Sequence, residues 1–365
     1  MTVQQKAFKS RRRYNQWVTN QTLEDFALRY TPVSARRWSA KQVVMTALSA
    51  ITFLALEAIG GALTLTYGFN YVVVAVILVS IIIFALSMPI AINAAKNGLD
   101  IDLLTRGAGF GYLGSTVTSL IYASFTFIFF ALEAAIMAMA LNMLFGLPLH
   151  FGYLIGSVVV IPLVTWGFTF ISRFQQFTQF CWLALQLLPF IFILIREHHV
   201  LQNWIDFPGF ITARDGSFDF LQLGAVCSVL LSLVSQVGEQ VDQVRFLPKP
   251  QHPARWRWYG AVIAAGPGWV VIGAIKILLG SFLAVLAFNY GLGAELASEP
   301  THMYLVAFSY VTHSSSTLLA LTGIFVVLSQ LKINVTNAYA GSIAWSNFFL
   351  RLTHRHPGRV VWLFF

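Results

Sequence analysis

One carboxylate interrupts an apolar stretch of the sequence, and its position is the first indication of chemistry. Glu133 lies near the middle of residues 126–140, which are otherwise apolar enough to lie in hydrocarbon. An acidic residue at the centre of a membrane helix costs roughly 2.5 to 3.5 kcal/mol on insertion scales, so it is expected to face a bundle interior or a wet cavity. At helical spacing Glu133 shares a face with Thr126 and Phe129. A carboxylate one turn from an aromatic ring suits a small planar ligand; alternatively, Glu133 pairs with a basic residue and only holds the bundle together.

The composition defines the class of protein that must position this carboxylate. The 365 residues are 57% hydrophobic and 10% charged, with a mean hydropathy of +0.72. In soluble domains about a quarter of the residues are charged. We therefore predict an all-helical, multi-pass protein whose main partner is the lipid bilayer. The net charge of +9 does not indicate a nucleic-acid partner, because the basic residues lie at the ends of apolar runs.

The chain divides into a basic tail, residues 1–42, and a transmembrane domain, residues 43–365. Lys and Arg are enriched in the tail and in every second loop, so the positive-inside rule predicts a cytoplasmic amino terminus in an inner or plasma membrane. Apolar runs of bilayer length occur at 43–67, 71–92, 115–144, 151–170, 177–195, 220–237, 260–288 and 317–331, and a ninth begins at Val360.

Two of these runs are interrupted. Gly60 and Gly61 are expected to break the first, and the polar residues 235–240 end the sixth. Paired interruptions in corresponding spans of two halves are typical of inverted-repeat transporters, in which unwound backbone lines a substrate cavity. The alternative for Gly60 and Gly61 alone is close packing of helices.

The eighth run ends in a polar cluster, residues 329–339, that contains Lys332. A lysine at this depth extends to the interface, pairs with a carboxylate or occupies a cation site. Glu57, Glu133 and Glu239 are the carboxylates that the sequence leaves open as its partner.

Four segments resemble a known family. They are the loop 102–111, residues 129–133, the Asp-x-x-Arg-Phe motif at 242–246, and residues 334–347. They are similar to the nucleobase–cation symporters, the permeases for cytosine, purines, uracil, thiamine, allantoin and hydantoins. The resemblance implies a leucine-transporter-type fold of five plus five inverted repeats, with a nucleobase-like substrate between spans 1, 3, 6 and 8. It implies transport rather than enzymatic activity, with no catalytic residue, metal site or cofactor.

The resemblance also implies site residues. Those for the substrate are Phe129, Glu133, Ser232, Leu233, Gly61 and Asn334, and those for a cation are Ser49, Thr52, Lys332 and Ile333. Phe129 replaces an aromatic that is often Trp, Glu133 replaces a glutamine, and Lys332 replaces a hydroxyl ligand. We hypothesise that the sodium site does not work and that Lys332 supplies the positive charge; coupling to Na⁺ or H⁺ stays open.

Two further expectations concern the whole chain: its completeness and its function. Because it ends a few residues into the ninth run, we expect a fragment or a truncated reading frame with an incomplete second repeat. The alternative to a permease is a ligand-sensing membrane domain, joined beyond residue 365 to a histidine-kinase signalling module. We expect no enzyme, because the sequence shows no phosphate-binding glycine loop and no nucleophile–base pair.

Overall fold

The computed structural model describes residues 13–14, 23–27, 30–36, 38–197, 199–211, 218–250, 255–356 and 358–364. Most of the predicted basic tail lies outside these ranges. The elements in chain order are β1 (Arg13–Tyr14), η2 (Val33–Ala35), α2 (Ala40–Ser49), α3 (Ala55–Tyr67), α4 (Phe69–Asn97), α5 (Ile101–Thr105), η3 (Arg106–Phe110), α6 (Gly111–Phe145), α7 (Leu149–Thr165), α8 (Phe168–Arg196), α9 (Val200–Ile205), α10 (Phe220–Leu231), η4 (Ser232–Gln236), α11 (Val237–Val244), α12 (Arg255–Ala265), α13 (Gly268–Asn289), α14 (Ala294–Ala297), α15 (Pro300–Ser309), α16 (Ser315–Thr353), β2 (Arg355–His356) and η5 (Val361–Leu363).

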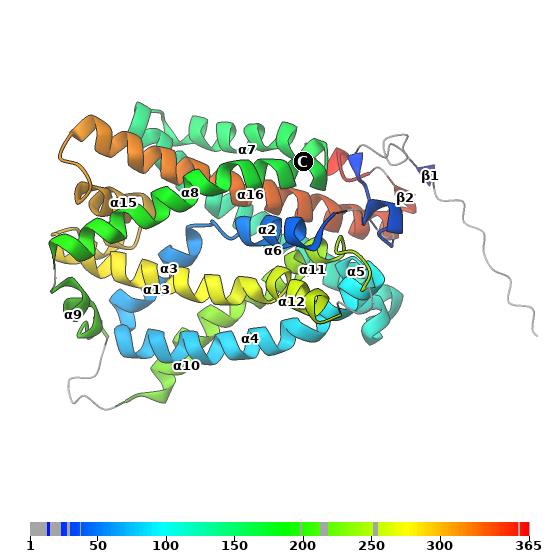
Figure 1. Ribbon diagram of the computed structural model, residues 1–365, viewed down its shortest axis with the longest axis horizontal. Helices are drawn as coiled ribbons and strands as arrows, with labels where there is room; N and C mark the ends of the chain where they lie inside the picture. The colour runs from blue at the N-terminus through cyan, green and yellow to red at the C-terminus, as the bar shows by residue number, and fades with distance from the viewer. Residues whose placement is uncertain are drawn as a thin grey trace, which may run out of the picture.

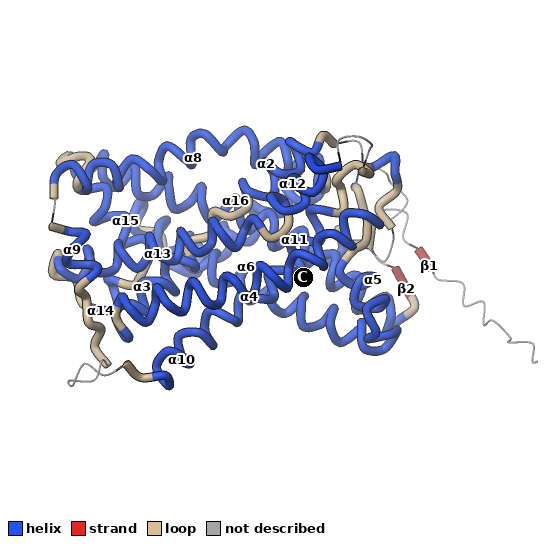
Figure 2. The backbone as a smooth tube through the Cα atoms, turned by 60° about the horizontal axis from the view of Figure 1, so that its bottom comes forward, coloured by secondary structure: helices blue, strands red, loops and turns tan. Residues whose placement is uncertain are grey.

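The long helices run side by side along the long axis of the molecule (Figure 1). Most of the described backbone is helical, and most loops gather at the two ends of the bundle (Figure 2). Among the described residues, six helical segments are long and apolar enough to cross a membrane, and α7 is a shorter apolar helix. Large apolar side chains such as Ile81, Ile121 and Phe177 are exposed on the outside of the bundle, where lipid is their expected solvent.

The first span is broken, but not at the glycines. Helix α2 ends at Ser49 and α3 begins at Ala55, so the break covers residues 50–54. The predicted break at Gly60 and Gly61 is wrong, because both lie inside α3. A Cβ atom on Gly60 would lie 1.9 Å from the carbonyl oxygen of Ile277 in α13. These glycines allow close contact between helices, which was the alternative explanation.

The sixth span is also broken, as the sequence predicts, although the break begins earlier. Helix α10 ends at Leu231, the 3₁₀ turn η4 covers Ser232–Gln236, and α11 continues from Val237 to Val244. Most of the polar stretch 235–240 therefore lies in a second helical segment rather than in a loop. Gly238 lets this segment approach α6, because a Cβ atom there would lie 2.4 Å from the Tyr122 ring.

Other boundaries also differ from the predicted runs. The eighth span continues far past residue 331, to Thr353, because its polar residues are buried inside the bundle instead of ending the helix. The seventh consists of α12 and α13, separated at Gly266 and Pro267. At the predicted ninth run the described residues form only the short turn η5.

Helices α6 and α16 make the central contact of the bundle. Ala123, Ala340 and Ala344 form a small buried cluster between them, and Gly341 lies against the Thr126 side chain. Small residues let two membrane helices approach closely. Because α6 carries Glu133, this packing holds the carboxylate in the interior.

Candidate ligand site between the interrupted helices

An apolar layer joins the two broken spans to the central helices. Phe53 from the first break, Phe129 from α6, Leu233 from η4 and Ile333 from α16 belong to one apolar cluster. The rings of Phe53 and Phe129 meet edge to face, with centroids 6.2 Å apart. The structure thus brings together three predicted site residues, Phe129, Leu233 and Ile333. Sequence reasoning missed Phe53, whose position became significant only once the break was located.

Glu133 lies one turn from Phe129 and is fully buried. Neither of its carboxylate oxygens has a hydrogen-bond partner. The Gln330 side chain and the Ala55 backbone are the hydrogen-bonding groups that face it, and Lys276 and Glu57 are the nearest interacting charges. Buried polar atoms are normally hydrogen-bonded, so two orphaned oxygens on one carboxylate require an explanation.

A buried ion pair lies beside this carboxylate. Glu57 on α3 accepts hydrogen bonds from Lys276 Nζ at 2.9 Å and from the Tyr304 hydroxyl at 2.8 Å. The Gln186 amide lies 3.4 Å from the same oxygen, and the Lys276 ammonium is 5.5 Å from the centroid of the Trp182 ring. Lys276 therefore pairs with Glu57 and not with Glu133. Sequence reasoning missed Lys276, although an ionisable residue within the apolar run 260–288 was a usable signal.

Lys332 is buried and faces α8. Its ammonium donates to the Gln175 carbonyl at 3.0 Å and to the Thr178 hydroxyl at 3.0 Å. None of the three carboxylates that the sequence left open is its partner, since Glu57 pairs with Lys276, Glu239 binds the Gln236 side chain and Glu133 is unpartnered.

Two further predicted cation residues, Ser49 and Thr52, lie at the first break. The Thr52 hydroxyl donates to the Ser329 carbonyl at 2.8 Å, which ties the break to α16. Ser49, the last residue of α2, is buried and its hydroxyl has no partner.

Three further predicted substrate residues lie elsewhere. Gly61 is at the contact of α3 with α13 and α15. Ser232 is exposed, and its hydroxyl donates to the Val229 carbonyl. Asn334 is buried on α16, with its amide nitrogen 3.4 Å from the Phe130 carbonyl oxygen. None of these residues belongs to the apolar layer.

Two of the four segments that carry the family resemblance, 102–111 and 242–246, contribute to buried ion pairs. Asp102 pairs with Arg351 of α16. Asp242 lies 3.6 Å from Arg245, which also donates to the Tyr339 hydroxyl. These contacts join the loop before α6, the second half of the sixth span and α16.

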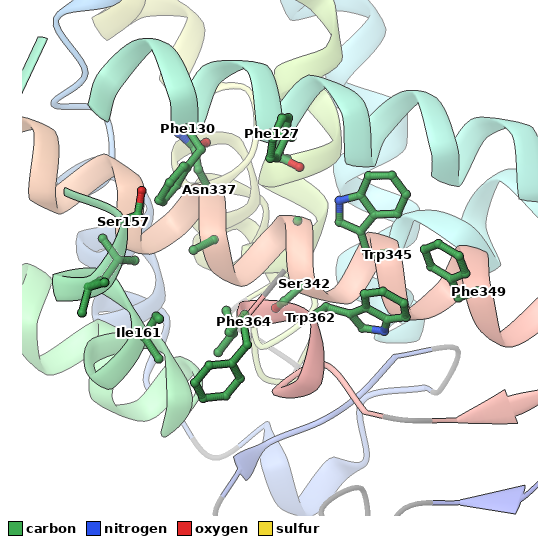
Figure 3. A pocket seen from close by; sticks show the side chains of 16 residues that line it. Phe127, Phe130, Ser157, Ile161, Asn337, Ser342, Trp345, Phe349, Trp362 and Phe364 are labelled. Carbon is green, nitrogen blue, oxygen red and sulfur yellow. The ribbon is translucent and has the colours of Figure 1, made fainter. Parts of the chain in front are cut away.

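A separate cavity of about 570 Å³ lies between α6, α7 and α16. The aromatic rings of Phe127, Trp345, Trp362 and Phe364 gather around it (Figure 3). None of the predicted substrate or cation residues lines it. It is therefore distinct from the site at Phe129 and Glu133.

No family model and no curated protein matches this sequence, whereas solved structures do. One is described as Mhp1, a nucleobase-cation-symport-1 family transporter, closed with bromovinylhydantoin bound. It has a TM-score of 0.67 and 15% identity, over 93% of this chain and 72% of that chain. Mhp1 in an inward-facing conformation has a TM-score of 0.65 and 17% identity, over 93% of this chain and 71% of that one.

The chain has the fold of Mhp1. The predicted leucine-transporter-type fold is thereby confirmed. The six described helical segments of membrane-spanning length agree with the prediction of an integral, multi-pass membrane protein. The count of five plus five repeats stays a prediction.

Proposed function

We propose that this chain is a secondary transporter for a nucleobase-like heterocycle, related to the nucleobase–cation symporters. The ligand binds between the two broken spans, α6 and α16, and Glu133 accepts hydrogen bonds from its edge. One observation carries the proposal: Glu133 is fully buried in a transporter fold, and both of its oxygens are unpartnered. Leaving a buried polar group unsatisfied costs about 1–3 kcal/mol. A bound ligand removes that cost, and intramembrane carboxylates commonly mark substrate pathways.

The apolar layer explains how a flat ring is held and how it gains access. The ligand stacks on Phe129, one turn from Glu133. Phe53 now packs against that ring, so the two rings separate when ligand binds. Phe53 lies in the non-helical segment 50–54 and Leu233 in η4. Non-helical hinge segments absorb backbone rotations at little cost.

We further propose that sodium does not drive transport. The Lys332 side chain of α16 occupies a predicted cation position and donates to the Gln175 carbonyl, and the Thr52 hydroxyl is already bonded to the Ser329 carbonyl. A sodium ion would have to share this region with the ammonium without a carboxylate to balance both charges. The driving force is then H⁺ or the gradient of the ligand itself.

The orientation of the chain in the membrane follows from the charged residues at the two ends of the bundle. Arg36, from the segment before α2, donates to the carbonyls of Ala95, Lys96 and Leu247, so the amino-terminal segment docks at the end of α4 that carries basic loops. By the positive-inside rule, we propose that this end is cytoplasmic.

Uptake into proteoliposomes tests transport and its driving ion together. Purified protein is reconstituted, and uptake of labelled uracil, cytosine, guanine and hydantoin is followed in sodium and in choline at equal ionic strength. We expect saturable uptake of at least one compound above that of protein-free liposomes, equal in the two salts. Uptake no greater than in protein-free liposomes contradicts transport, and a steep increase with sodium contradicts the role given to Lys332.

A further inference from the structure

A second buried carboxylate, Glu239 of α11, lies outside the candidate ligand site. It is 3% exposed. The Gln236 amide donates a hydrogen bond to one of its oxygens, and the Gln243 amide nitrogen lies 3.5 Å from the other. An isolated ionised carboxylate is very costly to bury, so such a group is neutralised by a positively charged side chain, a metal ion or a proton.

The charged and titratable groups around Glu239 do not include a positively charged partner for it. Asp242, on the same helix, is the charged residue that acts on Glu239, and its own ion pair is with Arg245. Tyr122 of α6 donates to Asp242 and also interacts with Glu239. Ser87 of α4 and the residues that α2, α12 and α13 place here are uncharged. The charged residues of α5 and α16 pair with each other.

A small polar cavity adjoins this carboxylate and favours a proton over a metal ion. It has a volume of about 20 Å³, and its polar lining is one carboxylate and three glutamines: Glu239, Gln236, Gln240 and Gln243. None of the predicted cation residues lines it. A cavity of this size holds about one water molecule. The two amides that face the carboxylate present nitrogen donors, whereas hard metal cations need oxygen ligands.

We propose that Glu239 carries the proton of the transport cycle, and that it is protonated while α2 and α11 are packed together. The inference rests on the proposed function and selects H⁺ from the two driving forces left open there. The cavity lies where Ala47 and Leu48 of α2 meet α11. Loss of the proton leaves a charge that needs water, so it favours separation of these two segments.

The same two segments connect Glu239 to the ligand site. The first break directly follows α2, and η4 directly precedes α11. A movement of α2 away from α11 therefore reaches Phe53 in the first break and Leu233 in η4, which belong to the apolar layer. Proton release and opening of the ligand site are thereby coupled.

Proton movement in proteoliposomes tests this role in the wild-type protein. A gradient of one pH unit, acidic outside, is imposed on vesicles that contain a pH-sensitive dye, and uptake of labelled uracil, cytosine, guanine and hydantoin is followed. At one proton per ligand, this gradient supports accumulation of up to about tenfold. We expect accumulation together with acidification of the interior. Ligand entry without acidification overturns the inference, whereas no uptake of any compound contradicts the proposed function itself.

The variant Glu239→Gln locks the site in a neutral form of nearly the same shape. We expect it to exchange labelled for unlabelled ligand as the wild type does, because exchange needs no net proton movement, but to lose accumulation in the pH gradient. Retained exchange also shows that the variant is folded. Glu295→Gln, at an exposed carboxylate of α14, is the control and is expected to accumulate ligand normally. Wild-type accumulation in Glu239→Gln, loss of its exchange, or the same defect in the control overturns the inference.

Discussion

At the scale of single residues, the ion pair between Glu57 and Lys276 is expected to be essential for stability. Removing one partner of a buried pair leaves an uncompensated charge and costs about 3–5 kcal/mol. We expect Lys276→Met to lower the melting temperature in detergent strongly, and the double variant Glu57→Gln/Lys276→Met to recover most of the loss. Lys96→Met, at an exposed lysine, is the control. A Lys276→Met protein that melts like the wild type contradicts this account of the pair.

Sequence reasoning located single residues better than their partners. Glu133, Phe129, Leu233 and Ile333 were named from their types and from the family resemblance, and the last three meet in one cluster. The partner of Glu57 was not found, because Lys276 lies 219 residues away along the chain. Periodicity shows which face of a helix a residue occupies, but it does not show which helix lies opposite.

At the scale of elements, the contact between α3 and α13 depends on glycine. A Cβ atom on Gly60 would overlap the Ile277 carbonyl oxygen at 1.9 Å, whereas nothing lies within 4 Å of one on Gly224 in α10. Overpacking of this kind costs about 1–3 kcal/mol. We expect Gly60→Ala to lower the melting temperature, because it forces α3 away from the helix that carries Lys276. Gly224→Ala, the control, is expected to be neutral; equal effects of the two changes would show that this close contact is unimportant.

The two helix breaks show what an element-level prediction lacks. Residues 50–54 contain neither glycine nor proline, so nothing local predicts a break. Tertiary contacts hold them instead: the Thr52 hydroxyl binds the Ser329 carbonyl, and the Leu54 backbone nitrogen lies 3.4 Å from the Gln330 carbonyl oxygen. The polar cluster 329–339, which ends the eighth apolar run in the sequence, does not end the helix. Several of its side chains, such as Lys332 and Asn334, are buried and hydrogen-bonded to neighbouring helices, and α16 continues.

At the scale of the whole molecule, composition, run lengths and the family resemblance were enough to predict the fold. The similarity to Mhp1, a TM-score of 0.67 at 15% identity, lies in the arrangement of the helices rather than in shared residues. That arrangement brings the first break, η4 and Phe129 of α6 into one apolar cluster, while α6 and α16 are packed through small side chains at the centre of the bundle.

The most direct test of the central claim is the affinity of Glu133→Ala for labelled guanine, cytosine and uracil. Loss of the hydrogen bonds to a charged acceptor is expected to weaken binding by about 10- to 100-fold, while size-exclusion behaviour and melting temperature show an assembled bundle. Leu132→Ala, at the neighbouring position with 49% of the residue exposed, should bind like the wild type. Unchanged affinity in Glu133→Ala would contradict the account and leave Glu133 as a purely structural residue.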